Sequence, residues 1–212
     1  MLKKITLKTK NNIYSINIEP NSIVKNLNNI VATNNKVIFL IDKKIFYIFK
    51  KLKNYKYQKY LIINCSEKLK SFKNYEKISQ KILNFNIDRN TKLIAIGGGT
   101  LGDLSGFIAS TILRGIDLIL FPTTLLSQVD SSIGGKNGIN TTSGKNLIGT
   151  FYQPKFVFID PNILSTLPKR EILSGYAEII KHGIINDLKF FNWLDKNSKK
   201  IITLNNEFLS EA

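Results

Sequence analysis

Apolar and polar residues alternate at the start of the chain, and short apolar runs recur after that. The segments KKITLKT (3–9) and IYSINIE (13–19) alternate on either side of Asn11 and Asn12, which predicts a β-hairpin. Further strands are predicted by five apolar runs: VIFLID (37–42), YQKYLIIN (57–64), KLIAI (92–96), DLILF (117–121) and KFVFID (155–160).

Two segments between these runs carry a helical period. KKIFYIFKKL (43–52) and SFKNYEKISQKILNF (71–85) predict helices, with Ser71 as the N-cap of the second. Strands that alternate with helices are typical of an α/β domain with a mainly parallel sheet. We therefore predict an α/β fold with a Rossmann-like open sheet that begins with the N-terminal hairpin.

The pattern changes at about Pro161. REILSGYAEIIKHGII (170–185) and the segment 190–212 predict helices and no further strand. We predict two domains, an α/β domain over residues 1–160 and the beginning of an all-helical domain over 161–212. The pattern is still amphipathic at Ala212 and has no helix-ending signal, so we expect a truncated chain with an incomplete helical domain.

Composition and charge narrow the class of protein. The hydrophobic fraction of 43% is ordinary for a folded protein, and the single cysteine, Cys65, excludes an internal disulfide. The N-terminus lacks a signal peptide and no apolar run is long enough to cross a membrane, so we expect a cytoplasmic protein without a membrane partner. The net charge of +16 comes from scattered lysines, which favours small anionic ligands, and no nucleic-acid-binding motif is present.

A glycine-rich loop, GGGTLGD (97–103), follows the strand KLIAI. Gly97, Gly99 and Gly102 satisfy the pattern G-x-G-x-x-G at a point where a strand turns into a helix. Glycine lets the backbone approach a pyrophosphate, and the helix N-terminus offers free N–H groups. The alternative is a tight strand–helix turn without a ligand.

A standard Rossmann site also needs an acidic residue at the carboxyl end of the next strand. Asp117 stands at the wrong end of DLILF, so it does not meet this requirement. Asp42, at the end of VIFLID, and Glu67, in the loop after YLIIN, are the other candidates, although each could be a solvated loop acid. Thr123 and Thr124 follow DLILF, where their hydroxyls could face a ligand or cap a helix.

The stretch SSIGGKNGINTTSGKN (131–146) is rich in glycine, hydroxyl and amide side chains and contains two lysines. It has too little apolar surface to build a core, and Asp130 stands directly before it. We predict a flexible loop whose backbone donors and lysines hold an anion. A solvated loop with incidental lysines is the alternative.

Taken together, the ordered motifs resemble the 3-dehydroquinate synthase family. They are GGGTLGD, RG, PTTLLSQVDSSIGGK, GKN, TLPKRE and AEIIKHG, and they cover roughly residues 97 to 187. The resemblance implies a carbon–oxygen lyase of the shikimate pathway, which leads to chorismate and the aromatic amino acids. It would convert 3-deoxy-D-arabino-heptulosonate 7-phosphate, a sugar phosphate, into 3-dehydroquinate and phosphate. In the family, NAD oxidises a ring hydroxyl and is regenerated, and a divalent metal, zinc or cobalt, polarises the reacting oxygen.

The resemblance also implies site residues. Lys136 and Asn146 would grip the substrate phosphate or hydroxyls, Arg114 would reach the phosphate across a homodimer interface, Asp130 would lie near the substrate and nicotinamide, and Lys181 would line the pocket. For NAD it assigns the ribose to Asp42 and Glu67, and the pyrophosphate to Gly98, Gly99 and Thr100. The other cofactor positions are Cys65, Ser66, Lys68, Leu69, Lys70, Leu101, Gly102, Asp103, Thr123, Thr124, Lys136, Lys145, Ile163, Leu164, Ser165 and Thr166.

The sequence departs from the family at several points. Ser66 stands where the family has glycine, and Thr100-Leu101 replaces its commoner small β-branched pair. Glu178 matches the first metal ligand, whereas the family takes two histidine ligands from its helical second domain. His182 is the only histidine, at a position that the family does not use as a ligand. A Glu178–His182 pair on one helix face could bind a metal weakly, but we predict that His182 is structural.

Three functions stay open on the sequence alone. The first is a truncated 3-dehydroquinate synthase, the second a catalytically inactive NAD-binding remnant of it, and the third, much less favoured, a nucleic-acid binder. We expect these 212 residues by themselves to bind NAD weakly and not to turn over substrate at a useful rate, because only Glu178 is a credible metal ligand.

Overall fold

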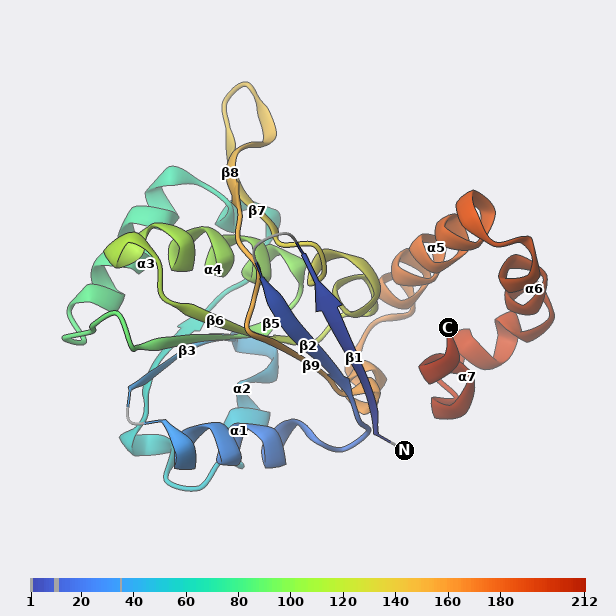
Figure 1. The fold of residues 1–212 in the computed structure, drawn as a ribbon, viewed down its shortest axis with the longest axis horizontal. Coiled ribbons are helices and arrows are strands. Elements are labelled where there is room, and N and C mark those ends of the chain that lie inside the picture. The colour runs from blue at the N-terminus through green and yellow to red at the C-terminus, as the bar shows by residue number, and fades with distance from the viewer. Residues whose placement is uncertain (1, 10–11, 35) are drawn as a thin grey trace.

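A seven-stranded sheet runs through the computed structural model, which describes residues 2–9, 12–34 and 36–212 (Figure 1). Its strand order is β1-β2-β9-β6-β5-β3-β4. The predicted hairpin is confirmed as the antiparallel pair β1 (Lys3–Lys8) and β2 (Ile13–Ile18), and its predicted turn residue Asn11 lies outside the described residues. Five strands continue the sheet in parallel with β2: β3 (Val37–Asp42), β4 (Lys59–Ile63), β5 (Lys92–Gly97), β6 (Asp117–Pro122) and β9 (Phe156–Ile159). The α/β class and the mainly parallel sheet are therefore confirmed.

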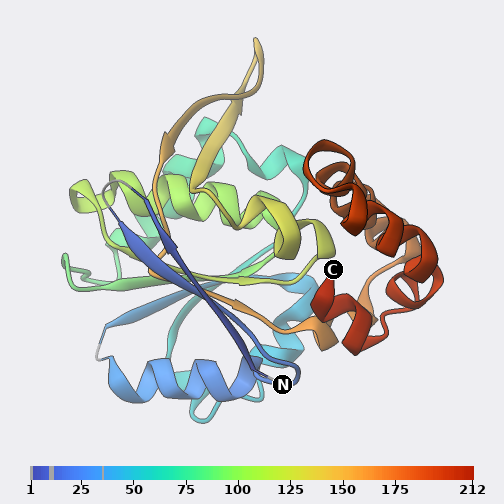
Figure 2. The same ribbon diagram turned by 45° about the vertical axis from the view of Figure 1, so that its right-hand side comes forward.

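Helices cover both faces of this sheet (Figures 1 and 2). Helices α1 (Ile23–Thr33) and α2 (Phe46–Phe49) lie against one face, and α3 (Phe72–Leu83) and α4 (Gly99–Thr111) lie against the other. Strand β3 is apolar at every position from Val37 to Ile41 because both of its faces are covered. Ser71 caps α3 as predicted, since its side chain accepts a hydrogen bond from the Asn74 N–H.

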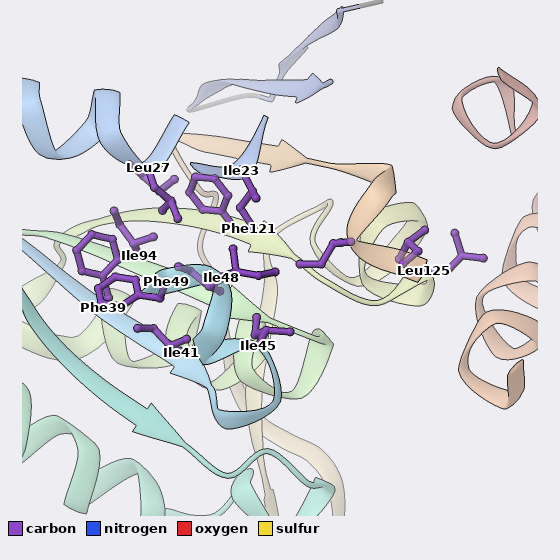
Figure 3. Close-up of a cluster of buried hydrophobic side chains, with 14 of the residues drawn as sticks. Ile23, Leu27, Phe39, Ile41, Ile45, Ile48, Phe49, Ile94, Phe121 and Leu125 are labelled. Atoms are coloured by element: carbon purple, nitrogen blue, oxygen red, sulfur yellow. The ribbon is translucent and has the colours of Figure 1, made fainter. Parts of the chain in front are cut away.

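The core consists of two clusters, one on each face. Figure 3 shows the first cluster, in which Phe39 and Phe49 meet edge to face with ring centroids 4.9 Å apart. The neighbouring residues of β3, Ile38 and Leu40, point the other way and pack in the second cluster with Leu101 of α4. The two clusters fix the strands, and the carboxyl ends of β3, β4, β5 and β6 form one edge, which we call the carboxyl edge.

The chain after β9 is helical, as predicted. Helices α5 (Lys169–Asn186), α6 (Leu188–Ile202) and α7 (Asn206–Glu211) lie together beside the sheet (Figures 1 and 2). Tyr176 and Leu194 of these helices share the first cluster with Leu125 and Ile163. The division into domains at residue 160 therefore stays a prediction. In the described part of the chain, no helix is long and apolar enough to cross a membrane.

The segment 131–146 is not the flexible loop that its composition predicted. Strands β7 (Lys136–Thr141) and β8 (Gly144–Phe151) form an antiparallel pair, the β7–β8 ribbon, which projects from the body (Figure 1). Ile139 is fully buried and anchors the ribbon in the second cluster. A Cβ on Gly149 would lie 2.1 Å from the Asn137 carbonyl oxygen, so this glycine serves close strand pairing and not flexibility.

The helix predicted over residues 43–52 is also wrong in extent. A 3₁₀ turn, Lys43–Ile45, leads into a single helical turn, α2. Asp42 fixes the start of this turn by accepting the Lys44 N–H at 3.0 Å. Helix α1 was not predicted.

Asp160, directly after β9, ties two loops together through a buried carboxylate. It accepts backbone N–H groups of Asn21 at 2.9 Å, Ile23 at 3.2 Å and Asn162 at 3.1 Å. We expect Asp160→Ala to lower the free energy of unfolding by about 2–4 kcal/mol, because three backbone donors, that of Ile23 buried, would lose their acceptor. Urea titration followed by circular dichroism measures this; the exposed Asp195→Ala should change stability little, and equal losses in both variants would contradict the assignment.

Candidate functional site

The glycine loop turns from β5 into α4 at the carboxyl edge. Gly98 caps the helix with extended backbone, and Gly99 begins it. A Cβ on Gly98 would lie 2.9 Å from Thr124 Cγ2, and a Cβ on Gly99 would lie 2.5 Å from Ser131 Oγ. These two glycines are therefore required by the close approach of the segment that follows β6.

Gly102 is different, because a Cβ there would meet no atom within 4 Å. It lines a narrow cleft of about 10 Å³ together with Gly97, Gly98, Gly99 and Ser131. The Ser131 hydroxyl is buried and has no hydrogen-bond partner among the described residues. Packing does not explain the glycine at 102 or the unpaired hydroxyl, and both lie at this narrow cleft.

Asp42 reaches the same place from β3. A Cβ on Gly97 would lie 3.4 Å from the Asp42 Cβ, so the carboxylate stands beside the glycine loop. Asp117 begins β6 at the opposite end, as its position in the sequence predicted. Its carboxylate pairs there with Lys92 at 3.5 Å. The sheet thus brings Asp42, and not Asp117, to the loop.

Cys65 lies next to Asp42 in the loop after β4. Burial raises the pKa of its thiol, and the Asp42 carboxylate raises it further. Above the ordinary thiol pKa the unfolded chain loses this proton while the folded chain keeps it, so this group lowers stability as pH rises.

We expect Cys65 to react with iodoacetamide at pH 8 at least about tenfold more slowly in the folded protein than in urea, because the thiolate is the reactive form. Mass spectrometry of timed samples measures the rate. Equal rates in both states would show that the thiol is neither buried nor held protonated.

The buried Lys70 and the half-buried Asp103 form an ion pair beside the glycine loop. Lys70 Nζ donates to Asp103 Oδ2 at 2.5 Å, and also to Asn146 Oδ1 in the ribbon. The pKa of Asp103 is raised, mainly by burial, and Lys70 opposes this shift. Glu67 joins the group by accepting the Asn140 side-chain amide at 2.8 Å. The loop after β4, helix α4 and the ribbon therefore meet at one point.

A cleft of about 630 Å³ opens between α4, the turn that contains Asp130 and the ribbon. Asp103, Asp130, Lys136 and Asn146 line it. The Lys136 ammonium is exposed and forms no ion pair with any described residue. This cleft shares Ser131 with the narrow cleft in front of α4, so the two adjoin.

Asp130, Glu178 and His182 bring their ligand atoms to within 4.8 Å of one another. Glu178 Oε1 lies 4.0 Å from His182 Nε2, and Glu178 also pairs with Lys181 one helical turn away. Gly175 lets α5 approach the turn with Asp130, since a Cβ there would lie 2.6 Å from the Leu126 N atom. The structural role of His182 stays a prediction. The structure places His182 beside two carboxylates, whereas the sequence indicated only Glu178 on the same helix.

Other predicted residues take varied positions. Thr123 is buried, and the Thr124 hydroxyl accepts the Ser127 N–H at 3.2 Å, as a helix cap would. Arg114 is exposed at the far end of α4 from the glycine loop. Leu69, Leu101, Ile163 and Leu164 are buried in the core, whereas the exposed positions are Ser66, Lys68, Lys145, Ser165 and Thr166, and Thr100 is half-buried.

The segment 163–166 does not join the clefts described above. It lines a separate hollow of about 270 Å³ with Asn21 and Tyr47, beside α1 and α2. Sequence reasoning missed Ser131 and Asn140. A run of polar residues gives no signal for either, because their positions depend on how the ribbon folds.

Known proteins resemble this chain in sequence and in fold. A sequence profile described as "3-dehydroquinate synthase N-terminal" matches residues 60–174, which is more than half of the chain. The chain belongs to the 3-dehydroquinate synthase family. The 3-dehydroquinate synthase of Pelagibacter ubique (strain HTCC1062) is 56% identical over 149 residues, 70% of this chain and 40% of that protein. The 3-dehydroquinate synthase of Prochlorococcus marinus (strain MIT 9515) is 47% identical across 97% of this chain and 60% of its own length.

Two solved structures of other enzymes have a similar fold. The 2-epi-5-epi-valiolone synthase of Streptomyces hygroscopicus, solved with NAD+ and Zn2+ bound, matches with a TM-score of 0.83 at 26% identity, over 93% of this chain and 57% of that one. A 2-deoxy-scyllo-inosose synthase complexed with carbaglucose-6-phosphate, NAD+ and Co2+ matches with a TM-score of 0.74 at 26% identity, over 85% and 51%. This chain thus spans about half the length of its 3-dehydroquinate synthase relatives.

Proposed function

We propose that this chain takes part in the 3-dehydroquinate synthase reaction, which forms 3-dehydroquinate and phosphate from 3-deoxy-D-arabino-heptulosonate 7-phosphate. The observation that carries the proposal is the meeting of two clefts at Ser131, a small one of about 10 Å³ beside the glycine loop and a large one of about 630 Å³ lined by Lys136. A cofactor bound at the glycine loop would touch a substrate in the large cleft. We place the protein in the cytoplasm, where a free thiol such as Cys65 stays reduced.

NAD would bind in front of the glycine loop, outside the first cleft, because that cleft of about 10 Å³ holds no more than a water molecule. The N-terminus of α4 offers unpaired backbone N–H groups to a pyrophosphate, and Gly102 leaves the space open. Asp42 stands at the end of β3, where a ribose would hydrogen-bond to its carboxylate. The Ser131 hydroxyl lacks a partner that such a ligand would supply. Residues 163–166 would contact the cofactor only if it extended from the glycine loop into the hollow beside α1.

The sugar phosphate fits the second cleft. Lys136 is an exposed cation without an ion-pair partner in the described chain, and Asn146 presents an amide on the facing strand. Asp130 lines this cleft and would orient a substrate hydroxyl. When bound, NAD would accept a hydride from the carbon that bears this hydroxyl, and a divalent metal would polarise the hydroxyl oxygen. Lys136 would hold the phosphate until it leaves.

The donor set beside Asp130 fits a divalent metal. Two carboxylates and one imidazole are ligands that zinc and cobalt accept. Glu178, Asp130 and His182 would need to approach slightly, since a shared ion holds its ligand atoms closer than 4.8 Å. We propose Glu178 as the first ligand, and Lys181 as a pocket residue that its ion pair holds in place.

We also propose a homodimer in which Arg114 acts on the partner's cleft. The position of Arg114, exposed and distant from the glycine loop of its own chain, supports this arrangement. Light scattering measures the mass in solution, and a monomer would exclude a site shared between chains.

The central test is binding of NAD and release of phosphate. We expect calorimetry to detect NAD binding, and inorganic phosphate to bind about tenfold more weakly to Lys136→Ala, which loses the cation. Lys77→Ala, at an exposed position of α3, is the matched control for phosphate. Failure of the wild-type chain to bind NAD would exclude the proposed function.

The alternative is an NAD-binding unit of this family without turnover. Phosphate release from the heptulosonate phosphate, with NAD and Co2+ added, separates the two functions. NAD binding without phosphate release would favour the alternative. Release that Lys136→Ala abolishes would establish the enzyme.

A further inference from the structure

Lys70 is a buried lysine that joins two parts of the site. Its side chain is 4% exposed, and its ammonium donates to Asp103 of α4 and to Asn146 of β8. A buried ammonium costs free energy unless oxygen atoms accept its hydrogen bonds. Moving Asp103 or Asn146 away from Lys70 is therefore unfavourable. These contacts connect residues 33 and 76 positions apart in the sequence.

The outer half of the β7–β8 ribbon depends on this lysine and its loop. This outer half is residues 140–148, beyond the buried Ile139; within the described chain these residues form hydrogen bonds outside the ribbon only with residues 67–70. The Asn140 N–H donates to the Lys70 carbonyl oxygen at 2.9 Å, and the Asn140 amide donates to Glu67 at 2.8 Å. Asn146 in turn donates its N–H to the Asn140 side chain at 3.0 Å.

The inner half of the ribbon is fixed separately, on α4. Thr150 donates its hydroxyl proton to Ser110 at 2.9 Å. The Asn137 amide lies against Gly106, where a Cβ would come within 1.7 Å of it. The ribbon, which projects from the body in Figure 1, thus has a base fixed on α4 and an outer half that is bonded to the loop after β4.

We propose that Lys70 is a positioning residue that couples the cofactor loop to the substrate cleft. A cofactor bound beside Glu67 and Asp103 would order these two groups, and Lys70 would transmit that order to Asn146. The outer half of the ribbon would then close the cleft over a phosphorylated substrate. The identity of the two ligands depends on the proposed function, whereas the link between loop and ribbon does not.

Hydrogen–deuterium exchange of the amides in residues 140–148 tests the link in the whole chain. Asn146→Gly removes the amide acceptor, tolerates the left-handed backbone at φ 56°, and leaves the Lys70–Asp103 pair intact. We expect exchange in these residues to accelerate about tenfold in Asn146→Gly and in Lys70→Met, as the loss of a charged hydrogen bond implies. Lys36→Met, which breaks the exposed pair with Asp88, should match the wild type.

Saturating NAD supplies the second readout. We expect it to slow exchange of the outer ribbon in the wild type and in Lys36→Met but not in Asn146→Gly. Equal slowing in Asn146→Gly, or wild-type exchange in that variant without NAD, would overturn the proposal. If Lys70→Met does not fold, Asn146→Gly decides alone. If the wild type binds no NAD, the proposed function fails, and the exchange without ligand still decides the positioning role.

Discussion

Replacing Glu178 by Gln should weaken Co2+ binding by roughly 100-fold or more, since the site would lose a charged ligand. The Glu178 Oε1 atom lies 4.0 Å from His182 Nε2. One ligand atom from each of these residues lies within 4.8 Å of a carboxylate oxygen of Asp130. Glutamine has the same shape as glutamate and keeps the packing of α5, but its neutral amide binds a divalent cation far less well. Cobalt absorbs visible light when bound, so titration measures the affinity without any assay of activity.

Two further variants show which groups complete the metal site. Asp130→Asn and His182→Ala should each weaken Co2+ binding if the chain supplies all three ligands, and neither should do so if Glu178 acts alone. Lys181→Met removes the ammonium that competes for Glu178, so it should bind Co2+ at least as tightly as the wild type. Unchanged affinity in Glu178→Gln would remove this residue from the metal site.

The sheet could be read from the sequence because its strands are buried on both faces. Runs such as Val37 to Ile41 are apolar at every position, and this signal is local. Parallel pairing of β3 with β5 brings Asp42 and the glycine loop to one edge. The position of Asp42 beside the glycine loop was therefore predictable in outline.

The ribbon could not be read in this way. Its strands contain few apolar residues, and Ile139 alone of them is fully buried. What fixes it is distant in sequence: Gly106 on α4 makes room for Asn137, and Lys70 holds Asn146. A glycine looks the same in the sequence whether it permits a flexible loop or a close strand pair, so composition predicted the wrong structure.

The same limit applies to the group around Glu178. The spacing of Glu178 and His182 on one helix was visible, but the approach of Asp130 was not. It depends on Gly175, which lets α5 lie directly against the chain after β6. The site is thus assembled by close backbone contacts, and these leave only single glycines as a trace in the sequence.

Gly102→Ala should make the protein more stable and its NAD binding weaker. Alanine favours the helix over glycine by up to about 1 kcal/mol, and a Cβ at this position of α4 meets no atom within 4 Å. A pyrophosphate in front of α4 would occupy that space, so we expect NAD affinity to fall by about tenfold, and further in Gly102→Leu. Urea titration measures the stability, and calorimetry measures the affinity.

Gly99→Ala is the matched control for Gly102→Ala, because its Cβ would lie 2.5 Å from Ser131 Oγ and disturb the protein itself. That variant should lose both stability and NAD affinity. A drop in affinity together with a rise in stability can arise at Gly102 only when the ligand, and not the fold, needs the open space. Wild-type affinity in Gly102→Ala and Gly102→Leu would show that no cofactor approaches this face of α4, and it would remove the glycine loop from the site.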